Sequence, residues 1–221
     1  MRIDVWSDVV CPWCWLGKAR LERALEDFPH RDRTDVHFHA FQLDPRMPKD
    51  LDVPTSEMLG KKYGMGPAQI AAAHERLRGL GEEVGVDFHF EQARTSNTLE
   101  AHELIAFARE KGKELAMVER LFRANFHDGI RIGERSNLLR LATEVGLDAG
   151  EAAAALADSR HASTVQADIA QAAELGVTGV PFFVIGGVLG VSGAQPAVVL
   201  RRVLDDGWAR ASSGPASSGT T

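Results

Sequence analysis

Residues 3–14 read Ile-Asp-Val-Trp-Ser-Asp-Val-Val-Cys-Pro-Trp-Cys, a short strand pattern that runs into a Cys-Pro-Trp-Cys motif. Cys11 and Cys14 are the only two cysteines in the 221 residues. Residues 3–6 predict a strand, and a helical pattern begins at Pro12, which a first turn tolerates because its missing N–H would have no partner there. Two thiols on the first turn of a helix can close and reopen a disulfide, so this strand-to-helix context predicts a redox motif.

The position of each cysteine predicts its role. At the start of a helix, Cys11 meets unpaired backbone N–H groups and the positive end of the macrodipole, both of which favour a thiolate. We therefore expect Cys11 to be the nucleophile. Cys14 lies one turn further into the helix and should be more buried, so it is expected to resolve the mixed disulfide.

A C-x-x-C motif is also half of a four-ligand zinc site. The chain has no second such pair, but His37 and His39 alternate on a predicted strand and share one face. A Cys2His2 site is therefore the alternative to redox chemistry. We favour the redox interpretation, because the strand-to-helix placement already accounts for the pair, and we assign no metal ligand.

Composition and charge narrow the class of protein. The chain is 44% hydrophobic and 25% charged, which is typical of a globular protein. Its net charge of −6 argues against general binding of nucleic acid or of an anionic membrane. No apolar run reaches the ~20 residues of a membrane span, and Asp4 stands where the apolar part of a secretory signal would form. We expect a cytoplasmic protein with no membrane or nucleic-acid partner.

Secondary-structure patterns divide the chain into three parts. Residues 2–43 predict strand, helix and strand, residues 54–175 predict a nearly all-helical stretch, and residues 182–191 predict a β-hairpin. A last helix is predicted over about residues 195–204. This order indicates an α/β domain interrupted by a helical insertion. The predicted boundaries are 1–45 and 176–208 for the two parts of the α/β domain, 46–175 for the insertion, and 209–221 for a disordered tail.

Four motifs in a fixed order carry a resemblance to a known family. They are Asp8-x-x-Cys11-Pro12-Trp13-Cys14, Ser96-Asn97 with Ala101-His102, Gly179-Val180-Pro181-Phe182-Phe183, and Ser192-Gly193-Ala194-Gln195. With them, residues 2–206 resemble the DsbA-like thioredoxin-fold family. Within it, the FrnE-type branch is the most similar, a branch related to 2-hydroxychromene-2-carboxylate isomerases and kappa-class glutathione transferases. The resemblance implies a thioredoxin-like α/β fold with a large all-helical insertion.

The resemblance also implies a substrate platform. In thioredoxin-like proteins a cis-proline packs beside the disulfide, at the place that Pro181 holds here. A cis bond presents the backbone of the preceding residue, Val180, to an incoming peptide as an edge-strand partner. We therefore expect Pro181 to be cis and Val180 to bind substrate.

Three further residues are expected to tune the cysteine pair. Pro12 stiffens the turn, and the uncharged Trp13 stands where DsbA has a histidine, so the pair should be less oxidising than that of DsbA. Thioredoxins and DsbA carry a buried acid six residues before the first cysteine, but Val5 stands there in this chain. Asp8 is the candidate that would move the proton of Cys14. A turn or helix-capping role is the alternative for Asp8.

Two pairs of polar residues are weaker candidates. Asn97 and His102 are either a helix-cap asparagine with a surface histidine or polar groups that face the disulfide. Ser192 and Gln195 should begin the last helix, whose N-terminus can hold a carboxylate. In relatives that use glutathione this region meets the γ-glutamyl end, so they either contact glutathione or only cap the helix.

The function these residues predict is dithiol–disulfide exchange with protein thiols or small thiols. No tightly bound cofactor is expected, and glutathione is a candidate co-substrate. One alternative is a glutathione-dependent isomerase or transferase that acts on a small aromatic or polyketide-type substrate. Those relatives usually have serine in place of Cys11 and no cysteine at Cys14, so the intact pair counts against it. A non-catalytic thioredoxin-like domain that binds a partner is the alternative from another class.

Overall fold

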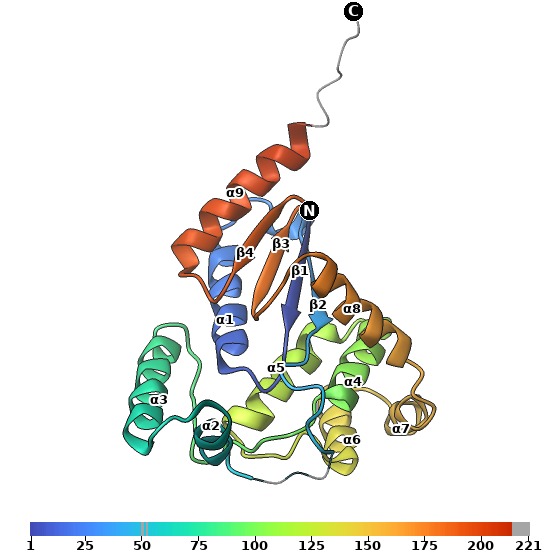
Figure 1. The fold of residues 1–221 in the computed structure, drawn as a ribbon. Helices are drawn as coiled ribbons and strands as arrows, with labels where there is room; N and C mark the ends of the chain where they lie inside the picture. Colours follow the sequence, from blue (N-terminus) through green and yellow to red (C-terminus); the bar gives the residue numbers. More distant parts are fainter. Residues whose placement is uncertain (50, 52, 214–221) are drawn as a thin grey trace, which may run out of the picture.

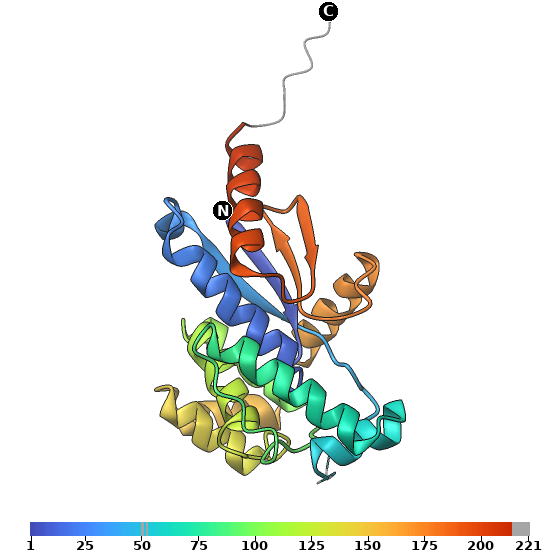
Figure 2. The same cartoon turned by 90° about the vertical axis from the view of Figure 1, so that its left-hand side faces the viewer.

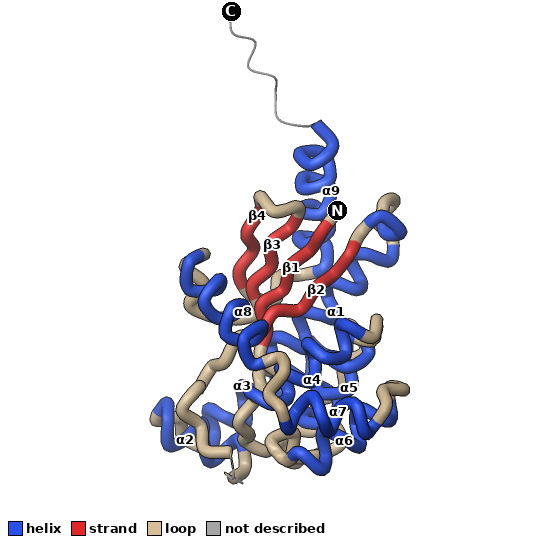
Figure 3. The backbone as a smooth tube through the Cα atoms, turned by 90° about the vertical axis from the view of Figure 1, so that its right-hand side faces the viewer, coloured by secondary structure: helices blue, strands red, loops and turns tan. Residues whose placement is uncertain are grey.

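A four-stranded sheet organises the fold of the computed structural model, which describes residues 1–49, 51 and 53–213. The strands lie in the order β2-β1-β3-β4 (Figure 1). β1 pairs in parallel with β2 and antiparallel with β3, and β4 pairs antiparallel with β3. Figure 3 shows the strands side by side in red. Their bounds are β1 Arg2–Ser7, β2 Asp35–Ala40, β3 Phe182–Ile185 and β4 Leu189–Ser192.

Alternation along β1 assigns its side chains to the two faces of the sheet. Ile3 and Val5 are buried with Leu200 of helix α9 (Ala197–Ser213) in the main core. Trp6 points to the other face and packs with Ala172 of helix α8 (Ala162–Glu174). Helices α1 and α9 therefore cover one face and α8 the other (Figure 2). The predicted α/β class with a thioredoxin-like sheet is confirmed.

The segment between β2 and β3 is helical, as predicted. It includes α8, so the range 46–175 contains a helix that lies directly on the sheet. Helices α2 and α3 lie beside the first turn of α1, on the side away from α6 and α7 (Figure 1). Within the described residues, no helix is long and apolar enough to cross a membrane. The remaining helices are α1 Pro12–Glu26, α2 Thr55–Tyr63, α3 Pro67–Glu82, α4 Leu99–Glu110, α5 Glu114–Phe126, α6 Arg135–Glu144 and α7 Ala149–Ala157, with a 3-10 turn at Arg31–Arg33.

The C-terminal helix departs from the prediction. It was expected to end near Leu204, with a disordered tail from residue 209, but α9 continues to Ser213. The reason is a tertiary contact, since the Trp208 ring packs edge-on to Phe28 and stacks on His30 at 4.0 Å. Arg33 lies over the same ring. The prediction was therefore wrong for residues 209–213, and the rest of the predicted tail lies outside the described residues.

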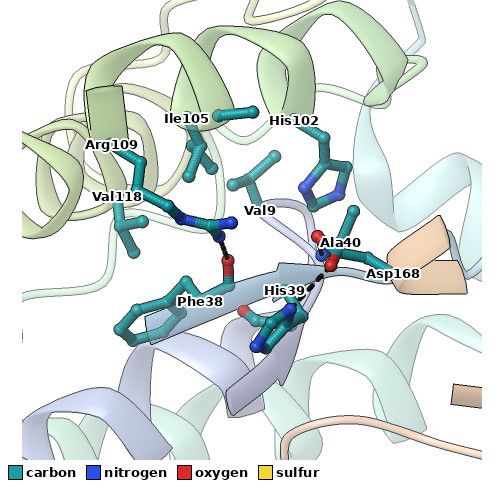
Figure 4. Close-up of a pocket in the computed structure, with 11 residues that line it drawn as sticks. Val9, Phe38, His39, Ala40, His102, Ile105, Arg109, Val118 and Asp168 are labelled. Atoms are coloured by element: carbon teal, nitrogen blue, oxygen red, sulfur yellow. Dashed lines mark hydrogen bonds and ion pairs between the residues drawn. The ribbon is translucent and has the colours of Figure 1, made fainter. Parts of the chain in front are cut away.

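A buried histidine links β1, β2 and α8. One ring nitrogen of His39 lies 2.6 Å from a carboxylate oxygen of Asp168 (Figure 4). The other lies 2.7 Å from a carboxylate oxygen of Asp4. The Trp6 indole stacks on this ring at 4.7 Å and donates its N–H to the Asp168 carbonyl. Burial alone lowers the pKa of His39, but the two carboxylates outweigh it and raise the pKa above its usual 6.5. The charged imidazolium is therefore the form that the folded protein stabilises.

We predict that His39→Gln costs about 3 kcal/mol of unfolding free energy at pH 6, and less at pH 9. The pKa of His39 is raised in the folded state, so its contribution is complete below the unfolded-state pKa and disappears as pH rises through the folded-state pKa. Urea unfolding at both pH values measures the difference. His37→Gln, on the same strand with a more exposed ring, is the control and should lower the unfolding free energy at pH 6 by less than His39→Gln does. An equal loss at both pH values for His39→Gln would contradict this assignment.

Candidate active site

The cysteine pair lies at the junction between β1 and α1. Cys11 is the N-cap residue of α1, with extended backbone angles (φ −96°, ψ 111°), and Pro12 occupies the first turn. The Cys11 N–H donates to the Asp8 carbonyl at 2.9 Å, and the Cys14 N–H donates to the Cys11 carbonyl at 3.0 Å. This tight turn puts the first sulfur at the helix N-terminus, in the strand-to-helix context that the sequence predicted.

The two thiols have different surroundings. Both are free and buried, but Cys11, at 5% exposure, borders a cavity, whereas Cys14, at 1% exposure, does not. Burial, followed by the neighbouring Cys11, raises the pKa of the Cys14 thiol well above 9.0. The backbone of Asp8 and the hydroxyl of Ser7 oppose this shift. Cys14 is therefore held as a neutral thiol until a reaction changes its surroundings.

The loop before β3 approaches the first cysteine. The Val180–Pro181 peptide bond is cis, in agreement with the prediction. The carbonyl oxygen of Val180 lies 3.7 Å from the Cys11 sulfur. Pro181 packs on Gly17 of α1, where an added Cβ would stand 2.8 Å from the proline ring. The Gly193 N–H donates to the Pro181 carbonyl at 2.8 Å, which ties the loop to the end of β4.

A cavity of about 450 Å³ opens over the Cys11 sulfur. Pro12, Trp13 and Val180 border it on the sheet side. Most of its other wall comes from the helical region, a contribution that the sequence analysis missed because it depends on long-range packing. Those apolar wall residues include Met58, Leu59, Tyr63, Leu77, Phe90 and Phe126, and the basic groups are Lys62, His74 and Arg94.

Trp13 is more than a spacer between the cysteines. Its ring is 36% exposed and borders the cavity, with the Arg76 guanidinium 5.9 Å from the ring centre. A cation over an indole face is a favourable contact that also orients the ring. The α3 helix thus helps to set the shape of the cavity mouth.

The structure excludes the helix-capping role considered for Asp8. No side chain caps α1. Instead, the buried carboxylate of Asp8 accepts the Leu43 N–H at 2.8 Å and lies 3.5 Å from Nε2 of His102. The same His102 nitrogen lies 3.1 Å from the Phe41 carbonyl oxygen. Asp8 therefore fixes the segment that follows β2 and forms a buried polar pair with His102.

Of the five predicted substrate residues, Val180 borders the cavity, whereas Pro181, Asn97, Ser192 and Gln195 do not. The amide of Asn97 is engaged on both sides, donating to the Met47 carbonyl and accepting the Leu99 N–H. Gln195 donates to the Ser192 carbonyl at 2.9 Å. These contacts are structural.

The other predictions for these polar residues also need correction. The last helix begins at Ala197, so the prediction that Ser192 begins it was wrong. His102 is buried at 4% exposure, so the prediction that it lies on the surface was also wrong.

The histidines considered as zinc ligands are engaged elsewhere. They alternate on β2 on the face opposite to Phe38, which joins the main core with Cys14. His37 pairs with Glu114, and His39 with Asp4 and Asp168.

The fold and the cysteine site define a thioredoxin-fold protein of the dithiol type. A family model for the DsbA-like thioredoxin domain matches residues 2–205, and the chain belongs to this family. A "probable DsbA oxidoreductase" from Streptomyces coelicolor is 42% identical in sequence, with a TM-score of 0.91 over 95% of this chain and 90% of that one. YwbO of Bacillus subtilis, described as uncharacterized, is 30% identical over 209 residues, which cover 93% of this chain and 96% of YwbO.

A more distant structure shares the fold. The cytosolic disulfide reductase DsbM of Pseudomonas aeruginosa is 20% identical, with a TM-score of 0.60 over 96% of this chain and 98% of DsbM.

We predict that Gly17→Ala lowers the unfolding free energy by about 1–3 kcal/mol and slows insulin-disulfide reduction. The added methyl group would press on Pro181 and Phe183, so the loop must move away from Cys11. Gly79→Ala in α3 is the matched control, since its Cβ would meet nothing within 4 Å. It should raise stability by about 0.5–1 kcal/mol and leave the rate unchanged. Equal effects of the two substitutions on the rate would refute the role of this contact.

Proposed function

We propose that this protein is a dithiol–disulfide oxidoreductase that acts through Cys11-Pro12-Trp13-Cys14. The observation that carries the proposal is the placement of the Cys11 sulfur. It stands at the N-terminus of α1, opens to an apolar cavity, and has the cis Pro181 loop on one side and a buried second thiol behind it. The membership of the DsbA-like family supports the same chemistry.

The exchange proceeds in two displacement steps. The Cys11 thiolate attacks one sulfur of a client disulfide, bonds to it, and displaces the other client sulfur as a thiolate. Cys14 then loses its proton, attacks the Cys11 sulfur and releases the second client thiolate. The client gains two electrons, and the pair becomes a disulfide. Two equivalents of a small thiol such as glutathione restore the dithiol and are themselves oxidised to a disulfide. When the same steps run in reverse, the disulfide of the pair oxidises a client dithiol.

The proton of Cys14 needs an acceptor, because its raised pKa keeps it neutral. We assign this role to Asp8, whose carboxylate is buried beside His102 and whose backbone contacts Cys14. Charge at this buried site is costly when it is unpaired. The Leu43 N–H, which donates to one oxygen of this carboxylate, lowers that cost, and Nε2 of His102 lies 3.5 Å from the other oxygen.

The cavity indicates the class of client. A predominantly apolar wall suits an extended, partly unfolded peptide, and the Val180 backbone offers it an edge-strand partner. The Lys62 ammonium on the wall, which also pairs with Asp44, would favour clients with carboxylates, glutathione among them. We place the reaction in the cytoplasm, as for the structurally similar DsbM, which is a cytosolic disulfide reductase. With Trp13 between the cysteines, we propose a pair less oxidising than that of DsbA.

We predict that Cys14→Ser turns the enzyme into a trap. Without the resolving thiol, Cys11 should stay bonded to its client, so mixed disulfides accumulate on non-reducing gels and insulin reduction falls about 100-fold or more. Cys11→Ser is the control and should show neither activity nor trapping. Undiminished turnover by Cys14→Ser would instead indicate isomerase or transferase chemistry. Inert thiols in the wild type would indicate a binding domain.

A further inference from the structure

Two histidines and an aspartate meet on the surface behind the active-site cavity. Nε2 of His89 lies 3.2 Å from Oδ2 of Asp87, and Nδ1 of His127 lies 3.4 Å from the same oxygen. One donor atom from each residue lies within 4.8 Å of those of the other two. Asp87 is largely exposed, and both rings are partly exposed, so a small ion can reach the cluster from solvent.

The local backbone holds the three side chains together. Burial alternates along residues 86–90, which follow α3: Phe88 and Phe90 are buried, whereas Asp87 is exposed and His89 is partly exposed. The His89 N–H donates to the Phe126 carbonyl at 2.7 Å, which fixes this segment to the end of α5. His127 is the C-cap residue of that helix. The two imidazoles stack at 4.2 Å.

The two imidazoles differ in their hydrogen bonds. Nδ1 of His127 lies 3.3 Å from the Asp87 carbonyl oxygen as well as 3.4 Å from its carboxylate, so a bound ion would take the place of the proton on that nitrogen. Nδ1 of His89 lies 3.1 Å from the His127 carbonyl oxygen, which can only accept, so in the neutral ring the proton is on Nδ1. Nε2 then directs a lone pair at the Asp87 carboxylate, another acceptor. Such a pair repels unless a proton or a cation lies between. Histidines that bind metals commonly donate their other N–H to a backbone carbonyl in this way.

The separations fit a tetrahedral metal ion. With bonds of about 2.0–2.2 Å to nitrogen and oxygen, two ligands of a tetrahedral zinc ion lie about 3.4 Å apart. Two of the three separations, 3.2 Å and 3.4 Å, are close to this value, and the third, between the two imidazole nitrogens, is within 4.8 Å. Imidazole nitrogens with one carboxylate suit zinc and its first-row neighbours rather than calcium or magnesium.

We propose that Asp87, His89 and His127 form a binding site for a divalent transition-metal ion of the zinc type, with a fourth position open to water. The bound ion would tie the 86–90 segment to the end of α5. Phe90 and Phe126, which border the active-site cavity, lie next to these ligands in the sequence. The site is separate from the cysteines, and its role is to stabilise this wall of the cavity.

The test is metal binding to full-length, tag-free protein that carries Cys11→Ser and Cys14→Ser, so that no thiol competes. Titration with Co²⁺, followed by visible absorption, and with Zn²⁺, against a chromophoric chelator, should show one equivalent bound. Saturation with Zn²⁺ should raise the Tm. Adding His89→Gln or His127→Gln to this protein should weaken the binding of both metals by at least about tenfold and remove the Tm shift.

The matched control is His30→Gln, which removes an imidazole that stacks on Trp208 of α9 and should leave metal binding unchanged. Far-ultraviolet circular dichroism of each variant establishes that it is folded. The absence of binding in the parent protein would overturn the proposal. So would affinities in folded His89→Gln and His127→Gln equal to that of the parent.

Discussion

The contact between α1 and the loop before β3 is the constraint on which the active site depends. Gly17 has no side chain, so the Pro181 ring can sit against the helix, and this close approach brings the Val180 carbonyl to 3.7 Å from the Cys11 sulfur. The sheet holds the helix and the loop close together. β1, which leads into α1, lies between β2 and β3, and β3 follows the loop. Cys11 and Val180, which are more than 160 residues apart in the sequence, are thereby brought into contact. The nucleophile belongs to the N-terminal part of the chain, whereas its platform belongs to the C-terminal part.

The helical region completes the site by enclosing the space above that sulfur. Residues of α2 and α3 supply apolar wall, and Arg76 orients the Trp13 ring at the cavity mouth. Phe90 and Phe126 of this wall pack on each other and on Phe88, and Phe88 and Phe126 also contact Trp15 of α1. Aromatic packing of this kind is dense and resists deformation. Changes in α2 and α3 are therefore expected to alter which clients bind, whereas the exchange chemistry stays with the α1 turn.

Sequence patterns predicted the features that local geometry determines. The strand, the turn and the helix around Cys11 follow from short-range preferences, and the Gly186-Gly187 turn between β3 and β4 follows from its positive φ angles. Features that depend on distant contacts were missed or misassigned. The extension of α9 needs Trp208 to meet Phe28, and the role of Asp8 needs the Leu43 backbone. Likewise, the amide of Asn97 is engaged by Met47, 50 residues away.

The central claim is that the fold makes Cys11, at the border of the cavity, the attacking sulfur and keeps Cys14 buried and neutral behind it. Iodoacetamide labelling of the reduced protein at pH 7, followed by peptide mass spectrometry over time, tests this most directly. The account predicts alkylation of Cys11 alone in the folded protein, with Cys14 labelled only after unfolding in urea. Labelling of both cysteines at similar rates in the folded protein, or of Cys14 first, would contradict it.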